Sequence, residues 1–201
     1  MISNDPVNFR KNIPSYILWE NLFVENELND IEKLCQKEEL HRSTTVGKGE
    51  DCEQHRKSKV KFISRNEENY WIFDKFNGVI DRINSTYFGF DLYGYKDFQY
   101  TVYDSLNKGM YDWHMDTVLG DNDCTDSVRK LTLVMLLSEP QVHFSGGEFQ
   151  INLGMEEDAR TPEMTRGKII AFPSFLIHRV KPVHLGIRKS IVIWVEGPKF
   201  R

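Results

Sequence analysis

The stretch Tyr111-Asp112-Trp113-His114-Met115-Asp116 places a histidine and a carboxylate two residues apart. In an extended strand, alternate side chains point to the same face, so His114 and Asp116 can converge on one point, whereas on a helix they would diverge. A neutral imidazole and a carboxylate supply two metal ligands. The spacing therefore predicts a strand that carries part of a metal site, although a strand end with a polar turn has the same pattern.

Two downstream features favour the metal site. His178 lies in Phe175-Leu176-Ile177-His178-Arg179-Val180, an apolar run typical of a buried strand, where an imidazole without a partner would be costly. Two histidines and one carboxylate form the facial arrangement that holds Fe(II) and leaves positions open for oxygen and a chelating co-substrate. Arg188 begins a predicted strand that becomes apolar towards Val195. Its guanidinium can donate two parallel hydrogen bonds to a carboxylate.

Other ionisable residues are weaker candidates for this site. His184 is the alternative to His178, but it lies in the turn-like stretch Lys181 to Gly186, and a turn is a poorer place to fix the angle of a ligand. Glu148 would be a second carboxylate, which a face of three ligands does not need. We expect the remaining histidines to be exposed, and these are His41, His55 and His143.

Composition bounds the class of protein. The chain has 201 residues, 40% hydrophobic and 12% aromatic, so it can bury a sizeable core as one domain. A net charge of −4 gives no reason to expect a nucleic-acid partner. Three separated cysteines without a Cys-x-x-Cys argue against a disulfide framework and against a thiolate zinc site. With no membrane-length apolar run and no signal-peptide pattern, we expect a soluble cytoplasmic protein without a membrane partner; its oligomeric state stays open.

Periodicity predicts helices early in the chain and strands late. A strand is expected at Tyr16 to Trp19, and helical spacing of apolar residues predicts helices at Glu27 to Cys35 and at Asn69 to Asn84. Short strands separated by Gly, Pro and Asp turns follow, without a strand-helix-strand repeat. They are expected at Phe98 to Tyr103, Met110 to His114, Lys130 to Leu137, Glu148 to Ile151, Lys168 to Phe172, Leu176 to Val180 and Lys189 to Val195.

Two polar segments could cover a site. Residues 41–59 are mixed in charge and read as a loop with short strands, either a mobile flap over a groove or a solvated connection. The acidic segment from Asp121 to Asp126 directly follows the metal strand, and it could be a lid or a solvated loop. The sequence does not separate these alternatives.

The order His114-x-Asp116, His178, then Arg188 with Ser190 resembles the Fe(II)/2-oxoglutarate-dependent dioxygenases, in particular the prolyl 4-hydroxylase and PKHD-type hydroxylase branch. The resemblance covers about residues 97 to 197 and includes further short motifs. These are Tyr103-Asp104-Ser105 with Gly109, Leu137-Ser138-Glu139-Pro140, Ser145-Gly146-Gly147-Glu148 and Gly167-Lys168-Ile169-Ile170-Ala171-Phe172-Pro173-Ser174.

This resemblance implies a fold, a reaction and a set of roles. The fold would be α+β, mainly β, with a double-stranded β-helix (jelly-roll) core at 97–197 and residues 1–96 as N-terminal support whose helices pack on one face. Iron would be held by His114, Asp116 and His178. The distal carboxylate of 2-oxoglutarate would bind Arg188, with hydrogen bonds from Ser190 and Tyr103.

The reaction implied is hydroxylation of an aliphatic carbon with Fe(II), 2-oxoglutarate and O2, releasing succinate and CO2, with ascorbate as a candidate reductant. A prolyl or other peptidyl side chain is the favoured substrate, and a small molecule remains open. Three alternatives are weighed against it. A cupin-like barrel would need a His-x-His pair, which is absent. A nucleic-acid demethylase would carry a second arginine at position 194, which is Trp. The third is a non-catalytic barrel that binds a small ligand or a partner.

Overall fold

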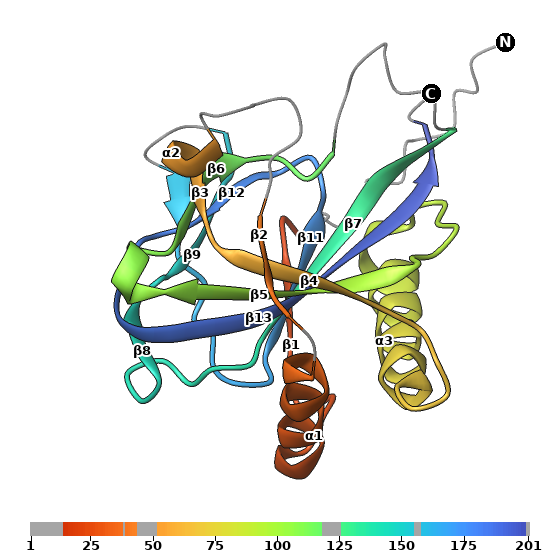
Figure 1. The fold of residues 1–201 in the computed structure, drawn as a ribbon. Helices are drawn as coiled ribbons and strands as arrows, with labels where there is room; N and C mark the ends of the chain where they lie inside the picture. The colour runs from red at the N-terminus through yellow and green to blue at the C-terminus, as the bar shows by residue number, and fades with distance from the viewer. Residues whose placement is uncertain (1–13, 38, 44–51, 118–125, 155–157, 200–201) are drawn as a thin grey trace, which may run out of the picture.

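The structure is a computed structural model that describes residues 14–37, 39–43, 52–117, 126–154 and 158–199. Positions 44–51 of the predicted flap lie outside these residues, and so does the predicted lid at 121–126 apart from its last residue. Two β-sheets form the body of the molecule (Figure 1). The residues predicted for the site come from both sheets, with His178 in the smaller one and Arg188 in the larger.

The larger sheet has the order β1, β11, β7, β13, β5, β4, β2, and β8 pairs with β13. All of the strand pairs in it are antiparallel. Its strands are β1 (Ile17–Trp19), β2 (His41–Arg42), β4 (Lys59–Ser64), β5 (Asp97–Asp104), β7 (Ser127–Leu136), β8 (Phe144–Gly146), β11 (Ile169–Pro173) and β13 (Val183–Pro198).

The smaller sheet has the order β10, β9, β12, β6, β3, also antiparallel throughout. Its strands are β3 (Arg56–Lys57), β6 (Met110–His114), β9 (Phe149–Asn152), β10 (Ala159–Arg160) and β12 (Ile177–Val180). From β6 onward the chain passes repeatedly between the two sheets, with β6, β9 and β12 in the smaller and β7, β11 and β13 in the larger. This winding is that of a double-stranded β-helix, which confirms the predicted jelly-roll fold.

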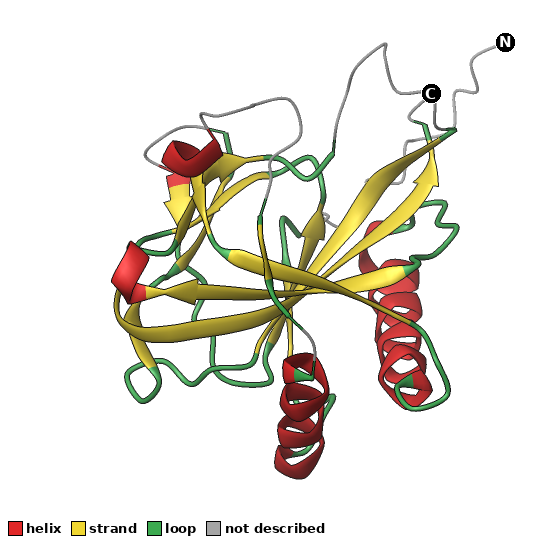
Figure 2. Ribbon diagram, in the orientation of Figure 1, coloured by secondary structure: helices red, strands yellow, loops and turns green. Residues whose placement is uncertain are grey.

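The two longer helices, α1 (Glu25–Gln36) and α3 (Tyr70–Ile83), lie against the larger sheet. The short helix α2 (Cys52–His55) lies beside β3 and β6 of the smaller sheet. A π-helical turn at Asn84–Phe88 follows α3, and a 3-10 turn spans Ser105–Asn107. Figure 2 shows α1 and α3 below the larger sheet. Ile31 of α1 and Phe76 of α3 are fully buried and belong to the same hydrophobic cluster as Leu133 of the sheet. The two helices expected from apolar spacing are therefore confirmed.

Alternation along β7 separates the two cores of the molecule. Leu133 and Met135 face the helices, while Val134 and Leu136 face the smaller sheet. Because successive side chains of a strand point to opposite faces, one strand contributes to both cores. The space between the sheets is thus lined by apolar side chains wherever the functional residues do not occupy it.

The strands predicted between residues 98 and 195 are present, but β13 begins at Val183 and not at Lys189. The segment interpreted as a turn around His184 is therefore part of a long strand. The residues that suggested a turn lie where the pairing of β13 with β8 is irregular, because the register shifts between Val183 and Leu185. Gly186 has a φ of +73°, and a Cβ there would lie 2.1 Å from the carbonyl oxygen of His143. Glycine is required by the close approach of two strands, which a sequence pattern cannot distinguish from a turn.

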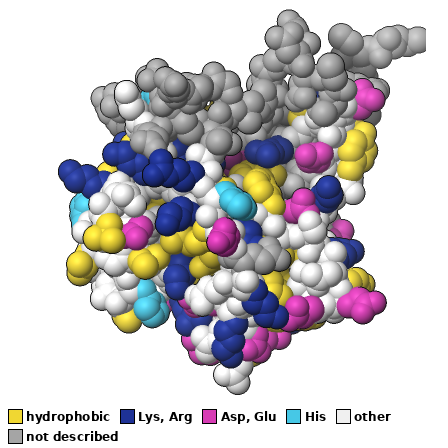
Figure 3. Space-filling model, in the orientation of Figure 1, with side chains coloured by type: hydrophobic (Ala, Val, Ile, Leu, Met, Phe, Trp, Pro, Cys, Tyr) yellow, Lys and Arg dark blue, Asp and Glu magenta, His cyan; other side chains and the backbone are white. Residues whose placement is uncertain are grey.

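The surface carries both signs of charge. On the face drawn in Figure 3, Lys and Arg side chains gather at the upper left, over the region of β3, and Asp and Glu are more frequent in the lower and right parts. Among the residues that the structure describes, no helix is both long enough and apolar enough to cross a membrane.

Candidate active site

His114 and His178 face each other across two neighbouring strands. They are direct Cα partners in the antiparallel pair of β6 and β12, and their ring centroids lie 4.2 Å apart. Residues opposite each other in such a pair project to the same face of the sheet, here the face that meets the larger sheet. His178 is buried, as expected for its apolar surroundings. The strand pairing thus brings together two imidazoles that are distant in the sequence.

Asp116 joins them from just beyond the end of β6. Its backbone N–H donates to the carbonyl oxygen of Ser174, at 3.0 Å, in the turn that precedes β12. Its Oδ2 accepts a hydrogen bond of 2.8 Å from the hydroxyl of Thr132 on β7, and that hydroxyl also lies 2.9 Å from Oγ of Ser174. The carboxylate is therefore held between the two sheets, with backbone and side chain both fixed.

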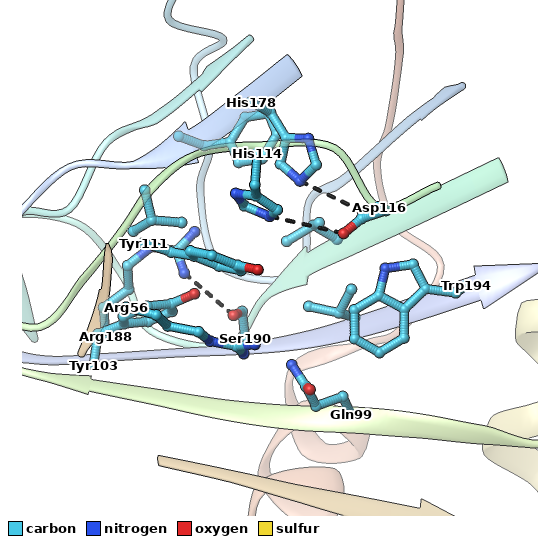
Figure 4. Close-up of a pocket in the computed structure, with 14 residues that line it drawn as sticks. Arg56, Gln99, Tyr103, Tyr111, His114, Asp116, His178, Arg188, Ser190 and Trp194 are labelled. Carbon is cyan, nitrogen blue, oxygen red and sulfur yellow. Dashed lines mark hydrogen bonds and ion pairs between the residues drawn. The ribbon is translucent and has the colours of Figure 1, made fainter. Parts of the chain in front are cut away.

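The three side chains have the geometry of a metal site. Nε2 of His114 lies 3.7 Å from Oδ1 of Asp116, and Nε2 of His178 lies 3.4 Å from Oδ2 (Figure 4). One candidate ligand atom from each residue lies within 4.8 Å of the others. This spacing, with three different chain segments converging, leaves room for one ion between them.

Hydrogen bonds set the tautomer that metal binding needs. Nδ1 of His114 lies 2.8 Å from the carbonyl oxygen of Asp112, and Nδ1 of His178 lies 2.9 Å from that of Leu176. A carbonyl only accepts, so the proton of each neutral ring sits on Nδ1 and the lone pair of Nε2 points at the shared centre. The donor set therefore fits Fe(II).

Electrostatics keep these groups in the ligating form. Burial, and after it the electrostatic interaction with the neighbouring His178, lower the pKa of His114 to about 3, so its imidazole is neutral at neutral pH. Burial alone would raise the pKa of Asp116, but the nearby histidines and the Thr132 hydrogen bond outweigh it and lower that pKa. A neutral imidazole and an ionised carboxylate are the states that bind a cation.

Arg188 is buried in the same pocket. It lies on β13, is 1% exposed, and donates a 3.2 Å hydrogen bond to Oγ of Ser190, which projects from the same face of that strand. Its guanidinium carbon lies 5.4 Å from the ring centroid of Tyr103. Among the described residues it forms no ion pair, and burial lowers its pKa. A buried guanidinium without a carboxylate is a receptor for an anion.

All six residues predicted for the site line one pocket of about 380 Å³, a volume that includes its open mouth. The pocket also contains residues that the sequence did not single out. Arg56 belongs to the segment predicted as a charged loop, but its side chain is buried. Gln99 and Trp194 lie at the end of the pocket opposite Arg56 (Figure 4). The further residues of the lining are Tyr111, Val134, Phe149, Val180 and Val192.

The weaker candidates lie away from the pocket. Glu148 is exposed and lies 3.5 Å from Lys181, and His184 is exposed on β13. His41 and His143 are also exposed, as expected. His55 is only partly exposed, with Nδ1 3.8 Å from Oδ2 of Asp112. No local signal marks Arg56, because only the pairing of β3 with β6 brings it to the site.

A jelly roll with two histidines, one carboxylate and a buried arginine in one pocket between its sheets is suited to hold a metal ion together with an organic acid. The sequence profile of the 2OG-Fe(II) oxygenase superfamily matches residues 98–196. A PKHD-type hydroxylase from Colwellia psychrerythraea is 33% identical over 99 residues, which are 49% of this chain and 42% of that relative. The chain thus aligns with less than half the length of this curated relative.

Solved structures agree on the fold. A viral collagen prolyl hydroxylase from Paramecium bursaria Chlorella virus-1, in complex with 2OG, has a TM-score of 0.70 and 19% identity, covering 92% of this chain and 97% of the viral chain. A prolyl hydroxylase from Trichoplax adhaerens, in complex with a hypoxia-inducible-factor peptide fragment, has a TM-score of 0.71 and 17% identity, covering 90% and 83%. Residues 98–196 thus match the 2OG-Fe(II) oxygenase superfamily, and the chain is similar in sequence to PKHD-type hydroxylases and in fold to prolyl hydroxylases.

Proposed function

We propose that this protein is an Fe(II)- and 2-oxoglutarate-dependent dioxygenase that hydroxylates an aliphatic carbon, most simply in a prolyl or other peptidyl side chain. The observation that carries the proposal is the convergence of both Nε2 atoms and the Asp116 carboxylate at one end of a pocket that also holds Arg188. A metal site and an anion receptor in one cavity suit a co-substrate that is both a chelator and a diacid.

Each residue has a defined role in this proposal. His114, Asp116 and His178 hold the iron. Arg188 binds the distal carboxylate of 2-oxoglutarate, with hydrogen bonds from Ser190 and Tyr103. Bound iron and 2-oxoglutarate would supply oxygen activation, with release of succinate and CO2.

The protein's own contribution is orientation and exclusion of water. Val134, Phe149, Val180 and Val192 form apolar walls between the two sheets. In such a low-dielectric space the charge of Arg188 interacts strongly with a carboxylate. Phe149 and Phe172 also pack against the ring of His178, with centroids 5.6 and 4.7 Å away, and so restrict its orientation.

The preference for a peptidyl substrate rests on the similarity to prolyl hydroxylases, one of which was solved with a bound peptide. Ascorbate is proposed as a reductant on the same basis. The whole chain is proposed to be one catalytic domain, with residues 97–197 as the core and 1–96 as support, because α1 and α3 share a core with β7 and β13.

The test is conversion of 2-oxoglutarate to succinate by the purified protein with Fe(II), in the presence and absence of oxygen. Succinate should form only with both Fe(II) and oxygen, and Asp116→Ala and His178→Ala should abolish it. His184→Ala, which removes an exposed histidine of the same region, is the matched control and should retain activity. Binding of a metal and 2-oxoglutarate without any succinate would instead support a non-catalytic barrel.

A further inference from the structure

Arg56 is a second buried guanidinium in the pocket. It is 9% exposed, whereas its neighbour Lys57 on the same short strand is exposed. The strand β3 pairs with β6 so that Arg56 is the direct partner of Tyr111, and its guanidinium carbon lies 4.4 Å from the Tyr111 ring centroid. Nε donates to Oγ of Ser58 at 3.0 Å. These two contacts aim the side chain inward and leave the terminal nitrogens for another partner.

No carboxylate partners Arg56 among the residues that the structure describes. Asp116 is the single carboxylate among the described residues of the pocket lining, and it belongs to the histidine cluster. Two buried positive charges without an anion between them repel each other and are poorly solvated. The pocket is therefore electrostatically incomplete at the end where Arg56 and Arg188 lie.

Both guanidiniums approach one point, and they come from opposite sheets. Figure 4 shows Arg56, Arg188, Tyr103 and Tyr111 grouped at the end of the pocket opposite Trp194. Burial raises the pKa of Tyr103, and the charges of Arg56 and of Arg188 both oppose that rise, which places each near the phenol. Arg56 therefore lines this end of the pocket from the smaller sheet, against the Tyr111 ring, and Arg188 lines it from the larger sheet, near the Tyr103 ring.

We propose that Arg56 and Arg188 together bind the distal carboxylate of the diacid co-substrate, as a clamp of two guanidiniums, one on each sheet. A carboxylate has enough lone pairs to accept hydrogen bonds from both. The proposal rests on the proposed function and extends it, because it makes Arg56 a specificity residue for a dicarboxylate over a monocarboxylate. Since β3 is a two-residue strand at the sheet edge, the bound diacid would also tie that edge to β13.

The experiment compares two oxo acids that differ in the distal carboxylate alone: 2-oxoglutarate and 2-oxopentanoate. Their dissociation constants are measured by calorimetry on the full chain loaded with Mn(II), without oxygen. Arg56→Met should weaken 2-oxoglutarate binding by about 10- to 100-fold and change 2-oxopentanoate binding by less than about twofold. The 2-oxoglutarate dissociation constant of Arg56→Lys should fall between those of wild type and Arg56→Met, because lysine keeps the charge and loses the bidentate contact.

Lys57→Met is the matched control, since it removes a positive charge from the exposed face of the same strand and tests general attraction by the basic surface. It should leave both constants unchanged. The clamp is overturned if Arg56→Met binds 2-oxoglutarate like wild type while Arg188→Met does not, or if Arg56→Met weakens both acids equally. If the wild-type protein binds 2-oxoglutarate no better than 2-oxopentanoate, the assignment of Arg188 fails, and with it the proposed function.

Discussion

The hydroxyl of Thr132, in the larger sheet, donates a 2.8 Å hydrogen bond to Oδ2 of Asp116, which follows a strand of the smaller sheet. This contact joins the two sheets at the candidate metal site. It also holds one carboxylate oxygen, so that the orientation of the other is determined before any ion arrives. Such partners of metal ligands commonly contribute about 10- to 100-fold to metal affinity.

Thr132→Val should therefore weaken metal binding by about 10-fold or more while the fold persists, because the substitution keeps the shape of the side chain and removes its hydroxyl. Mn(II) affinity, measured by titration, is the readout. Thr161→Val removes a hydroxyl that accepts a hydrogen bond from Gln150 at an exposed position, and it should leave Mn(II) affinity unchanged. Equal affinity in wild type and Thr132→Val would show that Asp116 needs no such support.

Arg188→Lys should weaken 2-oxoglutarate binding by about 10-fold and Arg188→Ala by about 100-fold, since lysine keeps the charge but loses the two-pronged contact. The dissociation constant in the presence of Mn(II) is the measurement. Arg160→Ala, at an exposed position of β10, is the control. An unchanged constant in Arg188→Ala would remove Arg188 from the binding site.

The ion pair between Glu27 of α1 and Lys75 of α3, at 2.6 Å, should make stability depend on pH. The hydrogen bond from Lys75 is the main cause that lowers the pKa of Glu27 below 4.5. The stabilisation is therefore present above pH 4.5 and is lost as the pH falls through the lower folded-state pKa. Both side chains are partly exposed, so the effect is about 0.5 kcal/mol, or about 1–2 °C in Tm.

Glu27→Gln should accordingly lower Tm at neutral pH and flatten its decline between about pH 5 and pH 3. Thermal melts across that range measure both effects. Glu67→Gln, at an exposed position, should behave like wild type. A Glu27→Gln profile parallel to that of wild type would mean that the pair contributes nothing to this pH dependence.

Cys35 should be unreactive in the native protein. It is fully buried on α1, and burial raises the pKa of its thiol to about 12, so almost no thiolate is present at neutral pH. In a Cys52→Ser, Cys124→Ser background, a thiol reagent should label the protein only in denaturant. Rapid labelling without denaturant would indicate that α1 leaves the sheet readily.

Local sequence pattern was enough to predict the three residues of the candidate metal site. His114 and Asp116 are separated by the period of a strand, and His178 lies in an apolar run, so each reveals its surroundings through its sequence neighbours. The helices were predictable for the same reason, because the apolar stripe of α3 repeats at about 3.6 residues. For the metal-site residues, however, only the structure shows that β6 ends at His114 and that Asp116 lies in the turn after the strand.

Tertiary structure alone decided the rest of the site. Arg56 looks like one charge among many in a polar segment, and it reaches the pocket because β3 pairs with β6. Thr132 can donate to Asp116 because the two sheets face each other. Gly186 lies where two strands approach closely, although its sequence neighbours predict a turn. Periodicity is a property of neighbouring residues, whereas the lining of a pocket depends on which distant strands meet, and that is set by the packing of the whole chain.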